Sequence, residues 1–287
     1  MAKILRPIEE LVKGVGLRID GMSQYCVGRV VKVGDFAWFC SRTFVWIVWK
    51  APRRDTVDQA FYNIGVLSLP VVMLTGMFIG MVLAVQTFTQ FKQLGMETML
   101  GGVISLSLVR ELGPVLAATM LAGRVGSSMA AEIGTMRVTE QIDALTAMGT
   151  NPIYYLVVPR FLACLILIPA LTVMADFMGI FGGAFYCIQI LDINAYHYWD
   201  NAQRFVGLFD IFAGIFKSTF FGGAIALISC YQGFKSDSGA EGVGKAATRS
   251  FVLSFVAILF LDLMLGIVLD RVHLLLGSGP TVIQGGL

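Results

Sequence analysis

Residues 59–91, QAFYNIGVLSLPVVMLTGMFIGMVLAVQTFTQF, contain no charged side chain. As a helix this segment is about 50 Å long, whereas the hydrocarbon core of a bilayer is about 30 Å thick. Such a helix must tilt, kink at Pro70 or project beyond the membrane. The whole chain of 287 residues is similar in character, with 56% hydrophobic and 14% charged residues, whereas soluble domains carry about 25% charged residues. The composition therefore predicts a membrane protein.

Four further apolar segments follow, near residues 99–133, 161–190, 207–234 and 251–269. They predict an all-α polytopic membrane protein with five transmembrane helices. Residues 36–50, FAWFCSRTFVWIVWK, are short for a span and rich in aromatic residues, which suits an elbow helix at the membrane interface; a sixth, short span is the alternative. The predicted organisation is a cytoplasmic and interfacial segment at 1–58, a permease domain at 59–270 and a tail at 271–287.

The distribution of Lys and Arg predicts the orientation, because cytoplasmic loops are enriched in basic residues. One side of the membrane receives the N-terminal segment and two basic connections; their Lys and Arg include Arg53, Arg54, Arg137, Arg160, Lys235, Lys245 and Arg249. The other side has fewer basic residues, with acidic ones beside them: Lys92, Arg204 and Arg271, with Glu97, Asp192, Asp200 and Asp270. We therefore expect a cytoplasmic N-terminus and a tail on the opposite, periplasmic side.

The segment VTEQIDALTAMGTNP, 138–152, lies on the predicted cytoplasmic side. Its apolar residues recur at helical spacing and form one stripe, made of Val138, Ile142, Leu145 and Met148. Glu140 and Asp143 share another face, Thr139 is the expected N-cap, and Gly149 and Pro152 end the helix. A helix over about 138–149 is too short to cross a bilayer. It is either a solvated connector or a docking helix for a soluble partner.

Five ionisable residues interrupt the apolar spans: Arg110, Glu111, Asp176, Lys217 and Asp262. A charge at the centre of a span costs roughly 2.5–3.5 kcal/mol on insertion scales. Arg110 and Glu111 are adjacent on a helix and point about 100° apart, so at least one needs a partner on another helix. Lys217 and Asp262 are the expected partners. The set is either a static packing network or a polar coupling element near a substrate cavity.

Small residues spaced four apart predict close helix packing in two spans. One stripe is Gly76, Gly80 and Ala84, and the other is Gly123, Ser127 and Ala131.

Several motifs that suggest other chemistry are incomplete. GAEGVGK, 239–245, matches a phosphate-binding loop, but Ala246 stands where Ser or Thr would hold Mg²⁺, and no strand–loop–helix frame surrounds it. The two His residues lie near span ends without a ligand cluster, so no metal site is expected. No catalytic residues, no cofactor of this chain and no nucleic-acid partner are predicted.

Three runs resemble the MlaE/YrbE family, the permease subunits of ABC transporters that work with MCE proteins. They are GVLSLPVVMLTGMFIGMVLAVQ (65–86), SLVRELGPVLAATMLAGRVGSSMAAEIGTMRVTEQIDAL (107–145) and GAEGVGKAATRSFV (239–252). The E-x-x-D-A element, Glu140, Asp143 and Ala144, is similar to the family signature. The resemblance covers roughly residues 55–270.

The resemblance implies an elbow helix plus five spans, assembled as a homodimer in the bacterial inner membrane. A cytoplasmic ATPase subunit would bind ATP and Mg²⁺, and the helix carrying Glu140, Asp143, Ala144 and Leu145 would be the coupling helix seated in its groove. A periplasmic MCE protein would complete a path for phospholipid or a related lipid. The lipid cavity would include Leu83, Thr87, Phe91 and Leu94. The family's intramembrane charges would map onto Arg110, Glu111, Lys217 and Asp262.

Two other classes of protein remain as alternatives. A proton-coupled secondary transporter or channel would use Glu111, Asp176 and Asp262 as a relay, although the spans show no inverted repeat. An intramembrane enzyme acting on lipid would use Ser128, but it would need a base, and no His lies deep in a span.

Overall fold

The computed structural model describes residues 30–47, 49 and 54–275, which form two units divided at residue 50. In the first unit a helix covers 30–47, starting six residues before the predicted elbow. Its apolar side chains are largely exposed, with Trp38 at 66% and Trp49 at 83%. An exposed aromatic helix is compatible with an interfacial position, and that position stays a prediction.

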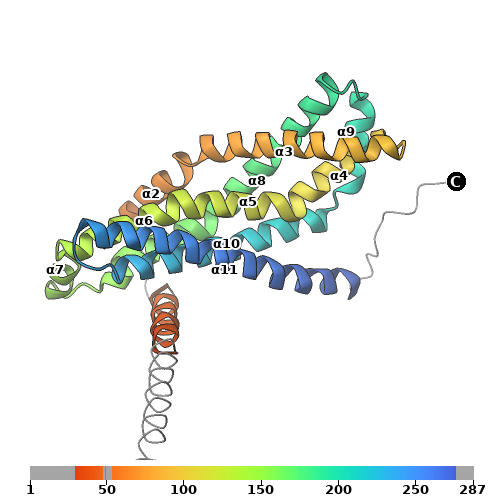
Figure 1. Cartoon of the computed structure of the whole chain (residues 1–287). Helices are drawn as coiled ribbons and strands as arrows, with labels where there is room; N and C mark the ends of the chain where they lie inside the picture. Colours follow the sequence, from red (N-terminus) through yellow and green to blue (C-terminus); the bar gives the residue numbers. More distant parts are fainter. Residues whose placement is uncertain (1–29, 48, 50–53, 276–287) are drawn as a thin grey trace, which may run out of the picture. The chain divides into compact units, whose positions relative to one another are not determined.

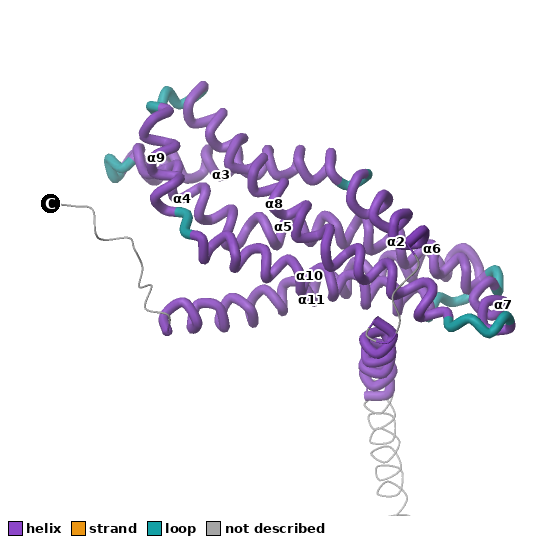
Figure 2. Tube along the Cα trace, turned by 180° about the vertical axis from the view of Figure 1, so that it is seen from behind, coloured by secondary structure: helices purple, strands orange, loops and turns teal. Residues whose placement is uncertain are grey.

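The second unit is helical throughout, and the part of it that the structure describes contains no strand (Figures 1 and 2). The π-helical turns η1, η3, η4 and η5 and the 3-10 turn η2 join or interrupt the α-helices. In chain order the elements are α2 (Arg54–Phe61), η1 (Tyr62–Val66), α3 (Leu69–Gln93), η2 (Glu97–Met99), α4 (Leu100–Ser107), η3 (Leu108–Leu112), α5 (Gly113–Leu121), η4 (Ala122–Gly126), α6 (Ser127–Val138), α7 (Gln141–Ala147), η5 (Ile153–Val157), α8 (Val158–Gln189), α9 (Ala195–Phe205), α10 (Leu208–Phe234) and α11 (Gly239–Leu275).

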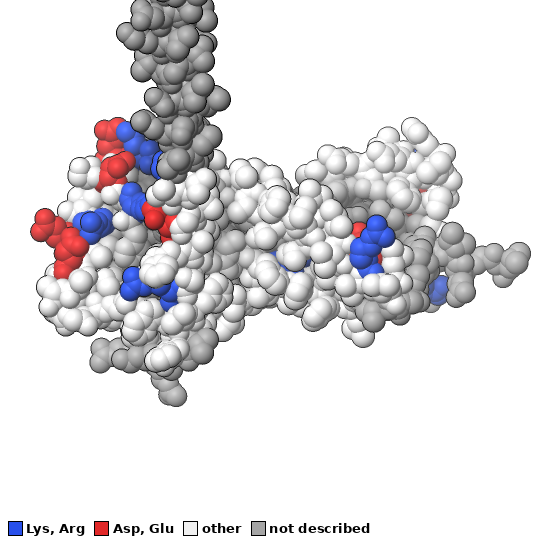
Figure 3. All heavy atoms as spheres, turned by 90° about the horizontal axis from the view of Figure 1, so that it is seen from below, with Lys and Arg blue, Asp and Glu red and all other residues white. Residues whose placement is uncertain are grey.

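Within the described residues, five helical segments are long and apolar enough to cross a membrane, which confirms the predicted number. They are Thr56–Gln93, Glu97–Val138, Ile153–Gln189, Leu208–Phe234 and Gly239–Leu275. The second has 42 residues and measures about 63 Å at 1.5 Å per residue, so its ends must extend beyond a 30 Å hydrocarbon core. In Figure 3 the charged side chains gather toward the two ends of this unit, and the surface between them is largely uncharged.

Three predicted boundaries fall inside helices. The helix α2 starts at Arg54, before the expected domain boundary at residue 59, and α11 continues to Leu275, past the expected boundary at 270. The segment GAEGVGK forms the first turns of α11, where a loop between spans was expected. Because GAEGVGK is helical, with an i,i+4 ion pair between Glu241 and Lys245, it does not form the loop that binds phosphate in a P-loop protein.

Helix α8 packs against α3 on one side and α10 on another, and it is the most buried of the spans. The predicted stripe of Gly76, Gly80 and Ala84 is buried on α3. A Cβ added at Gly80 would overlap the carbonyl oxygen of Gly179 on α8, which shows that the two backbones touch. Close contact of small residues is how membrane helices associate without a hydrophobic driving force.

The second small-residue stripe lies one position earlier than predicted. The expected residues Gly123, Ser127 and Ala131 are only half-buried, whereas the buried stripe consists of Ala122, Gly126, Ala130 and Gly134. Both frames contain small residues four apart, so spacing alone does not distinguish them. The buried frame meets α10 and α11, where the Ser250 hydroxyl contacts Ser229 at 2.8 Å and the Gly126 carbonyl at 3.3 Å.

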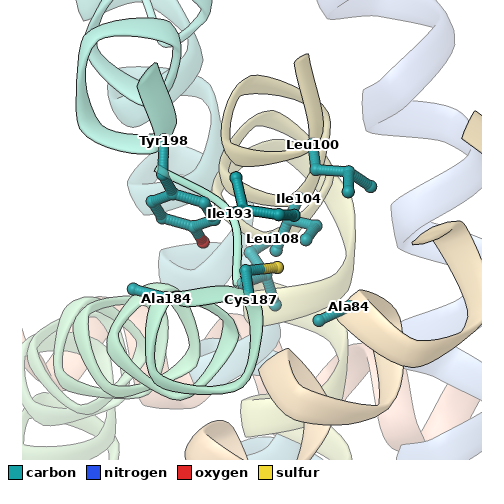
Figure 4. Packing of buried hydrophobic residues seen from close by; sticks show 8 residues of the cluster. All are labelled: Ala84, Leu100, Ile104, Leu108, Ala184, Cys187, Ile193 and Tyr198. Atoms are coloured by element: carbon teal, nitrogen blue, oxygen red, sulfur yellow. The ribbon is translucent and has the colours of Figure 1, made fainter. Parts of the chain in front are cut away.

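The short helix α9, between the third and fourth spans, was not predicted. Asn194 caps it by accepting a hydrogen bond from the Tyr196 backbone N–H at 2.9 Å. Tyr198 is fully buried and joins a core cluster drawn from α3, α4, α8 and α9 (Figure 4), and burial raises the pKa of its hydroxyl. Gly101 of α4 has no side chain to separate it from the Tyr198 carbonyl, so α9 lies directly against α4.

Candidate functional site

Lys217 is the centre of a charge cluster between spans. Its side chain, on α10, is 1% exposed and its Nζ donates a hydrogen bond to Glu111 Oε2 at 2.6 Å. Asp262 of α11 lies on another side, with Oδ1 at 3.1 Å from the same Nζ, as an ion pair without hydrogen-bond geometry. The buried ammonium group of Lys217 therefore contacts two carboxylates, one from each of two other spans.

Arg110, the fourth residue of the predicted charge set, faces other partners. Its guanidinium contacts Asp270 of α11 and lies 3.9 Å from Asp210 of α10. Asp210 also accepts a hydrogen bond from the Gly207 backbone N–H at 2.9 Å, at the start of α10. The expected pairing of Arg110 with Asp262 is therefore not what the structure has. Arg110 and Glu111 lie in the π-helical turn η3 and point to two separate clusters.

Asp176 lies apart from the Lys217 cluster. It sits within α8, and its Oδ1 has no hydrogen-bond partner among the described residues. A Cβ at Gly113 would overlap this oxygen, so the carboxyl group rests on the backbone of α5. The carboxylates proposed for a proton relay are thus divided between two environments, since Glu111 and Asp262 both meet Lys217.

Helix α7 is shorter than the predicted 138–149 and starts differently. Helix α6 ends at Val138, and the Thr139 hydroxyl donates to the Thr135 carbonyl at 2.9 Å instead of capping α7. Glu140 takes the N-cap position without a side-chain cap. Of the predicted apolar stripe, Ile142 is buried and Met148 is 70% exposed, so the last turn offers apolar surface outward.

The two carboxylates of this segment differ in their surroundings. Asp143 forms an ion pair with Arg137 at 2.7 Å, and both side chains are largely exposed. Glu140 is exposed and adopts φ of 59°, a left-handed conformation that costs a non-glycine residue roughly 1–2 kcal/mol. Glycine would adopt it more readily. A carboxylate at a strained, exposed position is the kind of outlier that points toward function.

The residues expected to line a lipid cavity differ in their exposure. Leu83 and Phe91 are partly buried against the core cluster around Tyr198, Thr87 is half-buried, and Leu94 is 69% exposed. The outward face of α3 carries a different stripe: Val71, Leu74, Phe78, Val82 and Val85. Within one chain, then, Leu83 and Phe91 border the interior of the bundle rather than its outer surface.

The described residues thus form a multi-pass membrane protein with five apolar spans, a buried cation shared by two carboxylates and a short exposed helix at one end. The family model described as Permease MlaE matches residues 57–268, which includes parts of all five spans and the whole of α7. The chain belongs to this family.

Its relatives carry consistent names. A probable ABC transporter permease protein of Rickettsia typhi is 46% identical over 84% of this chain and 93% of its own length. A probable ABC transporter permease protein of Synechocystis is 43% identical over 80% of this chain and 86% of its own length. The intermembrane phospholipid transport system permease protein MlaE of Haemophilus influenzae is 37% identical over 72% of this chain and 80% of its own length. The chain is therefore a permease subunit of an ABC transporter and not an enzyme, and ATP hydrolysis belongs to a separate subunit.

Proposed function

We propose that the protein moves phospholipid, or a related hydrophobic lipid, between the inner and outer membranes of a bacterial envelope. The observation that carries this proposal is the match over all five spans and α7 to a family whose member in Haemophilus influenzae is named for intermembrane phospholipid transport. A buried charge cluster linking three spans adds an element that ATP-driven motion can act on.

The proposed location is the inner membrane, with the N-terminus in the cytoplasm. The segments richest in Lys and Arg include the described start of the first span, the connection that contains α7 and the start of α11. Connections enriched in basic residues stay in the cytoplasm. In this orientation α7 faces the compartment that holds ATP, and α9 lies on the periplasmic side.

The proposed assembly contains two copies of this chain, an ATPase subunit for each and a periplasmic MCE protein. The family resemblance supports the homodimer. So does α11, which is the least buried of the five spans and leaves most of its apolar surface uncovered within one chain. The lipid cavity would form where the two copies meet, with Leu83, Thr87, Phe91 and Leu94 in its wall. Leu94 is already exposed, whereas Leu83 and Phe91 would reach this cavity only after a movement of α3 away from the core cluster.

Helix α7 is the proposed coupling helix. Glu140 presents negative charge, and Asp143 presents a carboxylate that is paired with Arg137. Ala144 and Leu145 contribute small and apolar surface next to the exposed Met148. A groove on the ATPase with basic residues and an apolar floor would fit this surface. Charge complementarity of this kind mainly sets specificity and the rate of association.

Affinity purification in mild detergent tests the coupling helix. The tagged chain should recover an ATPase subunit, measured by ATP hydrolysis and by mass spectrometry of the recovered subunit. The double change Glu140→Lys and Asp143→Lys should abolish this recovery while leaving membrane insertion intact. The matched control is Glu241→Lys, which reverses an exposed acidic residue in the first turn of α11. Undiminished ATPase recovery with the double change would return α7 to the role of a solvated connector.

A further inference from the structure

A cavity of about 560 Å³ lies at the α7 end of the bundle. Its walls come from three places in the chain: α2 with η1, α6 with η4, and η5 with the start of α8. Small-molecule sites in proteins have volumes of roughly 300–1,000 Å³. The cavity is distinct from the proposed lipid path, because none of Leu83, Thr87, Phe91 and Leu94 lines it.

The charges in the wall of this cavity do not cancel. Arg160 forms an ion pair with Glu132 at 2.9 Å and also donates to the Leu156 carbonyl at 2.7 Å. Arg124 instead donates to the hydroxyl of the buried Ser68, which is neutral. Among the described residues that line the cavity, Glu132 is the only acidic one, and it is paired with Arg160. This described lining has two guanidinium groups and one carboxylate, and no carboxylate of it contacts Arg124.

The other wall residues supply neutral hydrogen-bonding groups and an apolar surface. The hydrogen-bonding groups belong to Gln59, Asn63 and Tyr155. The apolar surface includes Met129 and Leu156. A guanidinium group with neutral donors beside it suits a phosphate oxyanion, which Arg can bind through two parallel N–H···O bonds. The apolar surface next to it suits the glycerol and first methylenes of a lipid.

The depth of the cavity also fits a lipid headgroup. Glu132 and Arg124 precede the end of α6 at Val138 by about 9 and 21 Å at 1.5 Å per residue. If the excess length of the second span over the hydrocarbon core is shared between its two ends, this range includes the level where headgroups meet acyl chains. Arg side chains reach that level from deeper backbone positions by extending along the helix.

We propose that this cavity binds the phosphate group of a membrane phospholipid from the leaflet at the α7 end, with Arg124 as the principal contact. Glu132 limits affinity because it neutralises Arg160. The proposal does not depend on lipid transport, because the headgroup can belong to the transported lipid or to a lipid that stays with the protein. Free phosphate shares the same chemistry and is separated from lipid by the experiment.

A site-resolved experiment places a photo-crosslinking amino acid at Gln59, on the cavity wall, in the full chain reconstituted in vesicles with increasing phosphatidylglycerol. Captured lipid is identified by mass spectrometry. The change Arg124→Gln should raise the half-saturating lipid fraction about tenfold, as expected for loss of a charge-assisted hydrogen bond. The matched control Arg249→Gln, on α11 and outside the cavity, should leave it unchanged.

The change Glu132→Gln should act in the opposite direction and lower the half-saturating fraction several-fold, because Arg160 is then released to the ligand. This gain of binding cannot result from misfolding, so it tests the proposed phosphate site even if Arg124→Gln fails to fold. Dioleoylglycerol, which lacks phosphate, should give little capture. Equal capture of dioleoylglycerol and phosphatidylglycerol, or no response to Glu132→Gln, would overturn the proposal. Displacement of captured lipid by millimolar inorganic phosphate would assign the site to a soluble anion instead.

Discussion

Removal of the cation at position 217 is the sharpest test of the charge cluster. In Lys217→Met, a side chain of similar length and volume leaves Glu111 and Asp262 without the cation that lies 2.6 and 3.1 Å from them. At an effective dielectric constant of about 20, each of these contacts, at 2.6 and 3.1 Å, is worth about 5–6 kcal/mol before desolvation is counted.

Two corrections reduce that figure. Desolvation of the buried Lys217 offsets much of the Coulomb attraction, and breaking a buried pair costs about 3–5 kcal/mol in practice. The Glu111 side chain is 48% exposed and that of Asp262 is 24% exposed, so solvent screens part of the remaining repulsion. We therefore expect a loss of about 3 kcal/mol, at the lower end of this range. That corresponds to a fall in Tm of about 6–12 °C for a chain of this size.

The assay is the fraction of monodisperse protein that remains after heating in detergent, compared across a series of variants. Glu111→Gln and Asp262→Asn should each cost much less than Lys217→Met, because Lys217 keeps one counter-charge in either case. The triple change Lys217→Met, Glu111→Gln and Asp262→Asn should recover most of the loss, since no uncompensated charge remains.

Charge reversal is a weaker test than neutralisation. Exchanging the charges of Lys217 and Glu111 restores their attraction but places a carboxylate at position 217 beside Asp262, so only partial rescue is expected. Unchanged stability of Lys217→Met, or additive destabilisation by the three neutralisations, would show that Lys217 does not stabilise the protein by balancing Glu111 and Asp262.

Three further predictions concern other parts of the bundle. Gly80→Ala should destabilise the protein by about 1–3 kcal/mol through overpacking, whereas Gly244→Ala, which meets open space, should be neutral or slightly stabilising in the same thermal assay; equal effects would remove the close-packing argument. Glu140→Gly should leave the Tm unchanged or raise it, because relieved backbone strain increases the free energy of unfolding by at most about 1 kcal/mol. The same change should reduce ATPase recovery, and full recovery would show that the carboxylate is dispensable. A photo-crosslinker at Leu83 should capture lipid in an ATP-dependent way, whereas one at the outward-facing Val85 should capture bulk lipid regardless of ATP; identical ATP dependence at both would remove Leu83 from the lipid path.

The number of spans was predictable because uncharged segments such as 59–91 leave few alternatives. The ends of the spans were not, because a helix that leaves the membrane can continue through charged residues. Thus α11 includes GAEGVGK at one end and extends to Leu275 at the other. Helix α9 escaped prediction because it is short and mixes polar and aromatic residues, and only the Asn194 cap marks its start.

The candidate site was predictable as a set of residues but not as a set of pairs. Lys217 and Glu111 were correctly expected to meet. The partners of Arg110 were not foreseen, because Asp210 and Asp270 lie at the ends of spans, where acidic residues are common. A sequence gives the depth of a charge along its own helix, but the rotation of neighbouring helices decides which charges face each other. That Arg124 faces a neutral hydroxyl, and not a carboxylate, in the described cavity likewise becomes visible only once α2, α6 and α8 are placed together.

ATP-dependent phospholipid movement by the complex isolated through this chain tests the proposed function most directly. Vesicles containing the permease with its co-purified ATPase, and carrying a labelled phospholipid, are incubated with ATP, with a non-hydrolysable analogue, or with a proton gradient alone. We expect transfer of label to an acceptor only with hydrolysable ATP, and loss of this transfer in the Glu140→Lys and Asp143→Lys variant. Transfer driven by the proton gradient without ATP, or no transfer of phospholipid while ATP is hydrolysed, would contradict the proposed function.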